Sequence, residues 1–330
     1  MALTPQLIHA RSKLLSQLVS SRAYKQVEFL AVGSFFTFKP SMDPEQKPTL
    51  SRVPSTREDI AFETSLSLKA KRGLMKFLKF ALEYEGESQR ELWEAHGDSL
   101  LNLFLQEQFK MDAELQKYIV ALTLSLDGQI STKDGLAIIY RHLTSMGFFG
   151  PGFAAVYPKW GGISEIAQVA CRAGAVGGAI YMLGTGINTS ETSGNEIKLQ
   201  LTSGDTVKTR LLVQDDNKTE GGSSISRLVV VVSSPLNGLF EPIVEGAPPP
   251  AVSVIAFPAG SLLTTTDKSY DFPVYVVAHS SDSGECPAGQ SKFSPFQSRF
   301  HLPYIHKVMM IQTLNTYLHC LSFGLDDNYL

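Results

Sequence analysis

The sequence predicts an α/β (α+β) fold in which a layered, β-rich domain is interrupted by a helical one. Three observations support this fold class. β-rich runs open the chain, helical periodicity replaces them at about residue 57, and β-rich runs return after Gly150. A chain of 330 residues is long enough for two domains with a sizeable core. We therefore expect residues 1–57 and 148–290 to form domain I, residues 58–147 to form a helical domain II, and residues 291–330 to be a tail.

The opening residues predict a helix and then a strand. Thr4 with Pro5 suits the start of a helix. The run "VEFLAVGSFFTF", residues 27–38, is rich in β-forming residues and predicts a strand. The leucines after Pro5 fall roughly on one helical face: Leu7, Leu14, Leu15 and Leu18.

The interrupting segment predicts a bundle of about four helices. Asp112 and Asp134 are candidate N-caps, and Ser88 with Glu91 is a candidate capping box. One apolar set has the i, i+3, i+4, i+7 spacing of a buried helix face: Leu74, Phe77, Leu78 and Ala81.

The chain after Gly150 predicts one more helix and several strands. Ser164 is a candidate N-cap, and the helix that follows ends at Gly177 and Gly178, after which we expect a strand. The turn "TSGD" between two alternating runs predicts a hairpin. "RLVVVV", "AVSVIAF" and "FPVYVVAH" predict further buried strands. Residues 291–330 show no clean period, so we expect them to add nothing to the core and treat them as a docking tail or non-native sequence.

Composition excludes several classes of function. A net charge of −3 gives no basic field for nucleic acid. No apolar run approaches the ~20 residues of a membrane span, and the N-terminus does not resemble a signal peptide. Cys171, Cys286 and Cys320 are scattered, with no metal or redox spacing. These features favour a soluble cytosolic protein without a bound metal.

Candidate chemistry is sparse. The sequence has no GxSxG, no HExxH and no paired-carboxylate signature, so we expect no catalytic residues. Gly177 and Gly178 follow a helix instead of preceding one, which is the reverse of a dinucleotide-binding loop. Glu165, Gln168 and Arg172 share one helix face by their i, i+3, i+7 spacing. That face is either a solvated surface or a polar patch for a protein partner.

Several blocks together resemble the Rab escort protein and Rab GDP-dissociation inhibitor family. These blocks are "LTPQLIHARSKLLSQLVSS", "VEFLAVGSFFTF", "VPST", "KAKRGLMKFLKFALEYE" and "FFGPGFAAVYPKWGGISEIAQVACRAGAVGGAIYML". Their order and spacing agree with the family over roughly residues 3–290. "GLMKFLKFALEYE" and Ile180 before Tyr181 are more similar to escort proteins than to dissociation inhibitors, so we favour the escort type.

The resemblance implies a fold related to flavin-binding oxidoreductases but used without flavin or another cofactor. It implies a non-catalytic component A of Rab geranylgeranyltransferase that binds GDP-loaded Rab GTPases. Such a protein presents them to the transferase heterodimer and carries the geranylgeranylated product to membranes, with only transient membrane contact. The alternatives are a dissociation inhibitor that recycles prenylated Rab and, from another class, a flavoenzyme of related fold.

The resemblance also assigns candidate site residues. Glu165, Gln168, Arg172 and Met182 match positions of the family's Rab-binding platform, and Ile180 lies among them. The helix at Leu74–Leu82 matches the region used for transferase docking and lipid shelter, for which the candidates are Met75, Phe77, Phe80 and Leu82.

The chain departs from the family in two places. The strand and glycine-rich turn with which the family begins would precede Met1, so we expect this chain to be N-terminally truncated. The turn "WGGISE" is one residue longer than usual, and Ala167 stands where proline is common.

Overall fold

The computed structural model describes Ala2 and residues 5–41, 48–53, 66–150, 152–214, 225–242, 245–262 and 269–298. By its internal contacts the chain divides into two compact units. The first comprises residues 1–167 and 224–330, and the second comprises residues 168–223.

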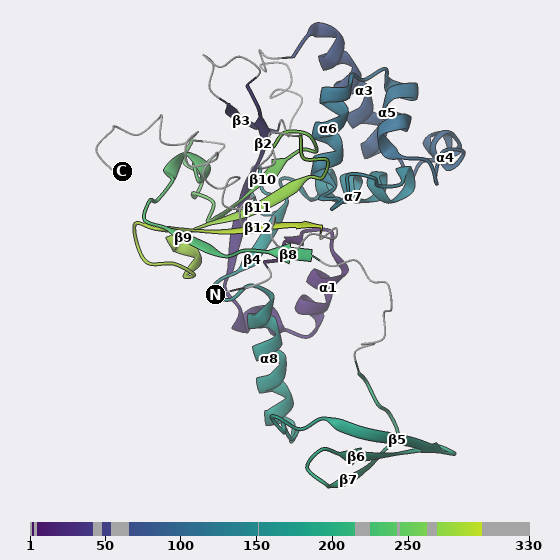
Figure 1. The fold of residues 1–330 in the computed structure, drawn as a ribbon, viewed down its shortest axis with the longest axis vertical. Helices are drawn as coiled ribbons and strands as arrows, with labels where there is room; N and C mark the ends of the chain where they lie inside the picture. The colour runs from purple at the N-terminus through teal and green to yellow at the C-terminus, as the bar shows by residue number, and fades with distance from the viewer. Residues whose placement is uncertain are drawn as a thin grey trace. The chain divides into compact units, whose positions relative to one another are not determined.

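A large mixed sheet is the centre of the first unit (Figure 1). Its strand order is β1-β4-β2-β10-β11-β12-β8, with β3 added beside β2 and β9 beside β12. The long strand β2 runs parallel to β10, and the other pairs are antiparallel. The strands are β1 (Ile8–His9), β2 (Phe29–Lys39), β3 (Thr49–Arg52), β4 (Ala155–Pro158), β8 (Ile225–Arg227), β9 (Val230–Val232), β10 (Val252–Phe257), β11 (Val274–Ser280) and β12 (Ser291–Ser298).

In the described part of the chain, five helices lie between β3 and β4 in the sequence and pack together beside the sheet (Figure 1). Their shared core contains Phe77, Phe104 and Leu136, all almost fully buried. A contiguous apolar core of this kind is what stabilises short helices that would be marginal alone. The helices are α3 (Leu68–Leu82), α4 (Glu87–Glu94), α5 (Leu101–Phe109), α6 (Ala113–Leu122) and α7 (Thr132–Ser145).

Two shorter kinds of element complete the first unit. Helix α1 (Lys13–Ser20) packs through Leu18 against Ile8 and Val156 of the sheet. The described residues of this unit also form the short 3₁₀ turns η1 (Ala23–Gln26), η2 (Asn237–Leu239) and η3 (Ser281–Ser283).

The second unit contains a small antiparallel sheet and most of helix α8 (Ile163–Val176), which begins in the first unit. The sheet has the order β5-β6-β7. The predicted hairpin around "TSGD" is confirmed, because β6 and β7 pair antiparallel across it. The strands are β5 (Ile187–Ser193), β6 (Glu196–Leu201) and β7 (Thr206–Thr209).

Several predicted helix starts are wrong. The first helix begins at Lys13, because Ser12 caps it through its side chain and β1 occupies the residues before it; Thr4 lies outside the described residues. Helix α7 is capped by Ser131, whose hydroxyl accepts from the Asp134 amide, so Asp134 lies in the first turn instead of at the cap. A Ser or Thr ahead of an acidic residue at N3 is the stronger capping arrangement.

The predicted starts of α4 and α8 are also wrong. Helix α4 begins at Glu87 after Gly86, so Ser88 and Glu91 lie within it. Helix α8 begins at Ile163, which places Ser164 inside the helix, where its hydroxyl donates to the Gly161 carbonyl. Residues 179–182, directly after Gly178, have no regular structure, and the next strand begins only at Ile187.

The prediction for the tail is wrong for its first eight residues. Residues 291–298 form β12, which pairs with β11 on one side and with β8 and β9 on the other. Phe293 and Lys292 of this strand are fully buried. Residues 299–330 lie outside the described residues, so the prediction is untested there.

A buried polar cluster joins β12 to β4 and β11. Tyr157 donates to Glu285 at 2.6 Å, and the Ala2 amide donates to the same carboxylate at 2.7 Å. The Lys292 ammonium forms an ion pair with Glu285 and donates to the Ala2 carbonyl. Burial would raise the pKa of Glu285, but the hydrogen bonds from Lys292 and Tyr157 hold it below its ordinary value.

Candidate functional site

Helix α8 carries the predicted polar trio. Glu165 is half-buried, whereas Gln168 and Arg172 are exposed. The three side chains follow one another along a single helix face because their spacing is close to whole helical turns. Glu165 and Gln168 each have a polar partner. Arg172 is the closest of the three to the C-terminal end of α8. The structure therefore presents a ridge with one anionic, one neutral and one cationic group.

The turn after α8 fixes the position of the next apolar residues. Gly178 adopts a positive φ of 91°, which favours glycine, and its amide donates to the Ala175 carbonyl. The Tyr181 hydroxyl then donates back to the Cys171 carbonyl at 3.0 Å. A Cβ on Gly174 would lie 2.3 Å from that hydroxyl, so only glycine allows this contact. Gly174 and Gly178 thus fold the segment back onto the end of α8.

This folded segment exposes its apolar side chains. Ile180 is 87% exposed and Met182 is 50% exposed, on either side of the anchored Tyr181. Large exposed apolar residues that are gathered locally are typical of protein interaction sites. Other exposed apolar residues of the same unit are Val176, Leu183, Ile187, Val207, Leu211 and Val213.

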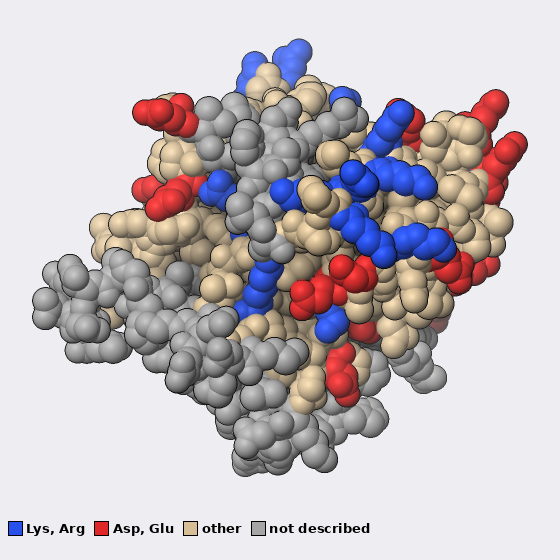
Figure 2. Space-filling view, turned by 90° about the horizontal axis from the view of Figure 1, so that it is seen from above, with Lys and Arg blue, Asp and Glu red and all other residues tan. Residues whose placement is uncertain are grey.

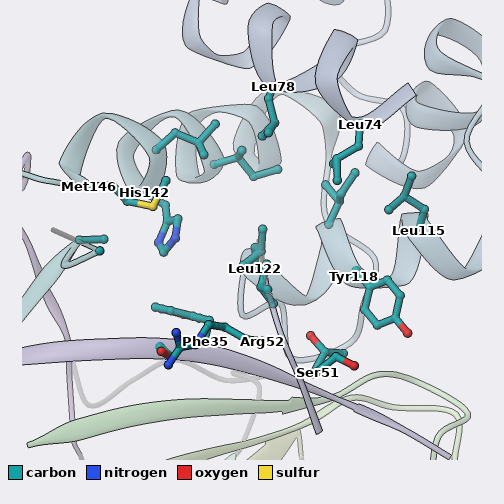
Figure 3. Close-up of a pocket in the computed structure, with 18 of the residues that line it drawn as sticks. Phe35, Ser51, Arg52, Leu74, Leu78, Leu115, Tyr118, Leu122, His142 and Met146 are labelled. Atoms are coloured by element: carbon teal, nitrogen blue, oxygen red, sulfur yellow. The ribbon is translucent and has the colours of Figure 1, made fainter. Parts of the chain in front are cut away.

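A cavity lies between the helices and the β2–β3 edge of the sheet in the first unit (Figure 3). Its volume is about 80 Å³, and half-buried residues such as Arg52 and Tyr118 stand at its rim. The wall is mostly apolar and comes from α3, α6 and α7. The labelled side chains of Figure 3 that line it are Phe35, Ser51, Arg52, Leu74, Leu78, Leu115, Tyr118, Leu122, His142 and Met146.

The four residues predicted for lipid shelter and docking separate into three environments. Phe77 is buried and lines the cavity. Phe80 packs on Phe109 with ring centroids 5.3 Å apart. Met75 is 39% exposed and Leu82 is 46% exposed. Only Phe77 of this set therefore lines the cavity, whereas Met75 and Leu82 are available on the surface.

Sequence reasoning missed the polar part of the cavity. Ser34 and Thr37 of β2 and His142 of α7 all line it. Side chains alternate between the two faces of a strand, so Thr37 lies on the same face of β2 as Phe35 and Lys39, which also line the cavity. Phe36 and Phe38 belong to a core cluster on the other face. This alternation could have indicated Thr37. Burial, and secondarily His9, lower the pKa of His142 to about 3, so its ring is neutral at pH 7.

Basic side chains are exposed on α3, one of the helices that form the cavity wall. Figure 2, which looks down on the end that carries α3, shows Lys and Arg gathered there. Helix α3 contributes four exposed cations: Lys69, Arg72, Lys76 and Lys79. Within the described part of the chain, no group of three or more His, Cys, Asp or Glu residues could hold a metal ion. The helices of that part of the chain are all too short or too polar to span a membrane.

Solved structures with similar folds confirm the predicted flavin-oxidoreductase-like architecture. A Rab GDI from Plasmodium falciparum superposes with a TM-score of 0.66 at 16% identity, covering 96% of this chain and 70% of that one. A putrescine oxidase gives a TM-score of 0.54 at 12% identity, covering 96% and 70%. At these identities the likeness concerns the fold alone.

Sequence relatives point to one family. The "Rab proteins geranylgeranyltransferase component A" of Candida albicans is 31% identical over 303 residues, which cover 88% of this chain and 44% of the relative. The protein of that name from Saccharomyces cerevisiae is 29% identical over 268 residues, covering 79% and 42%. The chain thus spans less than half the length of these two relatives. The model of the GDP dissociation inhibitor family matches residues 1–241, and the chain belongs to that family.

Proposed function

We propose that this chain is a Rab escort-type binding protein without catalytic residues of its own. Its family and the names of its relatives, which are components of Rab geranylgeranyltransferase, support binding of Rab GTPases and association with that transferase. The single observation that carries the proposal is that α8 exposes Gln168 and Arg172 and that the turn after it exposes Ile180 and Met182. Charged groups next to exposed apolar side chains form the usual composition of a protein interface.

The proposed cycle has three steps. In the cytosol, the chain binds GDP-loaded Rab through α8 and the following turn and presents it to the transferase heterodimer. It then carries the geranylgeranylated product to membranes. Helix α3 would serve the second and third steps. Its exposed Met75 and Leu82 would contact the transferase, and Phe77 would shelter part of the lipid at the cavity.

The sheltering step requires movement of the helices. A cavity of about 80 Å³ is smaller than the ~150 Å³ cavity that holds one benzene molecule, so a C20 chain would have to part its walls. Leu, Met and Phe side chains permit such repacking. The second candidate within the family is a dissociation inhibitor that recycles prenylated Rab and does not serve the transferase.

Co-capture distinguishes the two candidates. The immobilised chain is incubated with GDP-loaded Rab, either unprenylated or geranylgeranylated, with and without the transferase heterodimer. We expect capture of Rab, and capture of the transferase only when Rab is present. Capture of prenylated Rab alone, without transferase, would support the dissociation inhibitor, and failure to capture either form of Rab would contradict both candidates.

A further inference from the structure

The turn before α8 holds Trp160 in a backbone conformation that a bulky residue rarely adopts. Its φ is 76°, in the left-handed region that favours glycine, and no other aromatic residue of the described chain has a positive φ. Strained residues of this kind persist only where the surrounding structure holds them, and they gather at functional sites. Trp160 must therefore be held in this conformation by its neighbours.

Contacts from two separate segments of the first unit fix the position of the indole. The Trp160 amide donates to the Ser283 carbonyl at 2.9 Å, and a Cβ at Gly284 would overlap the ring, so glycine leaves the room that the indole needs. The Lys159 amide donates to the Glu28 carbonyl at 2.9 Å, and Lys159 Nζ pairs with Glu28 Oε1 at 2.8 Å. The same Nζ lies 5.1 Å from the centre of the indole ring, within the range of a cation–π contact.

These contacts present the indole to solvent instead of burying it. Trp160 is 56% exposed, whereas Trp93, the other tryptophan of the chain, is 9% exposed and donates to the Tyr84 carbonyl. An exposed indole keeps a large apolar surface in water, which is unfavourable in a free protein. Tryptophan is also among the residues that most often dominate the binding free energy of a protein interface. A strained, firmly held and exposed tryptophan is therefore typical of a binding site.

Trp160 adjoins the surface proposed to bind the GTPase. Helix α8 begins three residues later, at Ile163, and Glu165 lies in its first turn. A Cβ on Gly161 would lie only 2.6 Å from Glu165 Oε1, so the Glu165 carboxylate packs against the residue that follows Trp160. Trp160, Gly161 and Glu165 all belong to the first unit. A GTPase bound at Glu165 would therefore have the indole within its reach.

We propose that Trp160 is a hot spot of the Rab-binding surface and that its indole packs against an apolar or aromatic side chain of the GTPase. The ion pair of Lys159 with Glu28 would border this contact as a polar rim, the usual surrounding of an apolar hot spot. This inference rests on the proposed function, because its partner is the GTPase that α8 is proposed to bind. It adds an aromatic contact that neither the polar trio nor Ile180 and Met182 can supply.

Titration of GDP-loaded, unprenylated Rab against the full chain tests this role. Trp160→Gly removes the indole and suits the positive φ, so we expect the chain to stay folded and its Rab affinity to fall at least about tenfold. The matched control is Phe148→Ala, because Phe148 is 58% exposed and the Arg11 guanidinium lies 5.5 Å from its ring centre. This control should bind Rab within about twofold of the wild type, as residues outside a hot spot do.

The outcomes separate this inference from the proposed function. If the wild type binds Rab and Trp160→Gly binds it equally well, or if both variants lose affinity equally, only the role of Trp160 is overturned. A wild-type chain that binds no Rab would overturn the proposed function together with it.

Hydroxyl-radical footprinting of the wild-type chain needs no variant and keeps the test open if Trp160→Gly does not fold. Exposed aromatic rings are oxidised, and mass spectrometry of the peptides locates the oxidation. GDP-loaded Rab should reduce the oxidation of Trp160 and leave that of Phe148 as in the free chain. Unchanged oxidation of Trp160 in the complex, or equal protection of both rings, would contradict the proposed contact.

Discussion

Lys292 is a fully buried lysine, and its environment explains how the core tolerates it. Its ammonium group contacts the Glu285 carboxylate and the Ala2 carbonyl, and Tyr157 satisfies the second carboxylate oxygen. A buried ion pair is held in place by such complete hydrogen bonding, and removal of one partner leaves an uncompensated charge. The pair therefore matters to the fold even though it takes no part in the proposed function.

Substitution of Lys292 by methionine tests this role. We expect Lys292→Met to lower the free energy of unfolding in urea by ~3–5 kcal/mol, because Glu285 would keep its charge without a counterion. Lys159→Met is the control, since Lys159 pairs with the well-exposed Glu28 at 2.8 Å and such pairs contribute ~1 kcal/mol or less. Similar losses in the two variants would show that the buried pair is not special.

The half-buried His9 and the buried His142 and His279 predict loss of stability in acid. Burial is the main cause that lowers the pKa of His9 to about 4, and Arg141 adds to it. Burial also lowers the pKa of His142 to about 3, with a smaller contribution from His9. The pKa of His279 is lowered to about 3 in the same way, with a smaller contribution from Lys292. The unfolded chain takes up these protons near pH 6.5 and the folded chain does not. Stability therefore falls as the pH drops below about 6.5, by ~2 kcal/mol for each histidine at pH 5.

Urea denaturation at pH 7 and pH 5 measures this effect. His9→Gln should reduce the difference between the two free energies of unfolding by about 2 kcal/mol, because glutamine does not titrate. An unchanged difference in this variant would mean that His9 is protonated alike in the folded and unfolded states.

At the level of elements, the sequence predicted the buried faces that periodicity determines, but of its proposed helix caps only Asp112 is confirmed. Asp112 caps α6 as expected, and the buried face of α3 contains Leu74, Phe77 and Ala81 as the spacing indicated. β10 and β11 are buried strands because both faces of the sheet are covered there. These features depend on neighbours a few residues away.

Features that depend on distant residues were not predictable in this way. β12 has no clean alternation, because Lys292 and Gln297 are buried on a strand that reads as polar. The burial of Lys292 depends on Glu285, a partner that the strand's own sequence does not reveal. The polar part of the cavity was missed for the same reason, since Thr37 and His142 come to line one cavity only after β2 and α7 pack.

The position of β12 predicts the result of two truncations. A chain that ends after Gln290 should lose cooperative unfolding, because β11, β8 and β9 would lose their shared partner strand. A chain that ends after Ser298 should unfold within ~0.5 kcal/mol of the full chain. Thermal denaturation followed by circular dichroism compares the two, and equal behaviour of both truncations would contradict the structural role of β12.

At the scale of the whole molecule, the helices α3–α7 and the second unit come from separate stretches of the chain. The helices α3–α7 interrupt a sheet whose strands come from both ends of the sequence, as the change of periodicity at about residue 57 predicted. The second unit, residues 168–223, carries four of the five candidate Rab-binding residues. The limits of domain II and the roles of the site residues stay predictions, because contacts alone do not assign them.

Arg172 offers the most direct test of the central claim, which is that α8 binds a Rab GTPase. It is exposed on a helix whose packing does not require it. In a titration of GDP-loaded Rab GTPases against the full chain, Arg172→Ala should weaken binding by ~1–3 kcal/mol, about 5- to 150-fold, with the melting temperature unchanged. Arg90→Ala, at another exposed arginine, should bind like the wild type. Unchanged Rab affinity in Arg172→Ala would contradict the account.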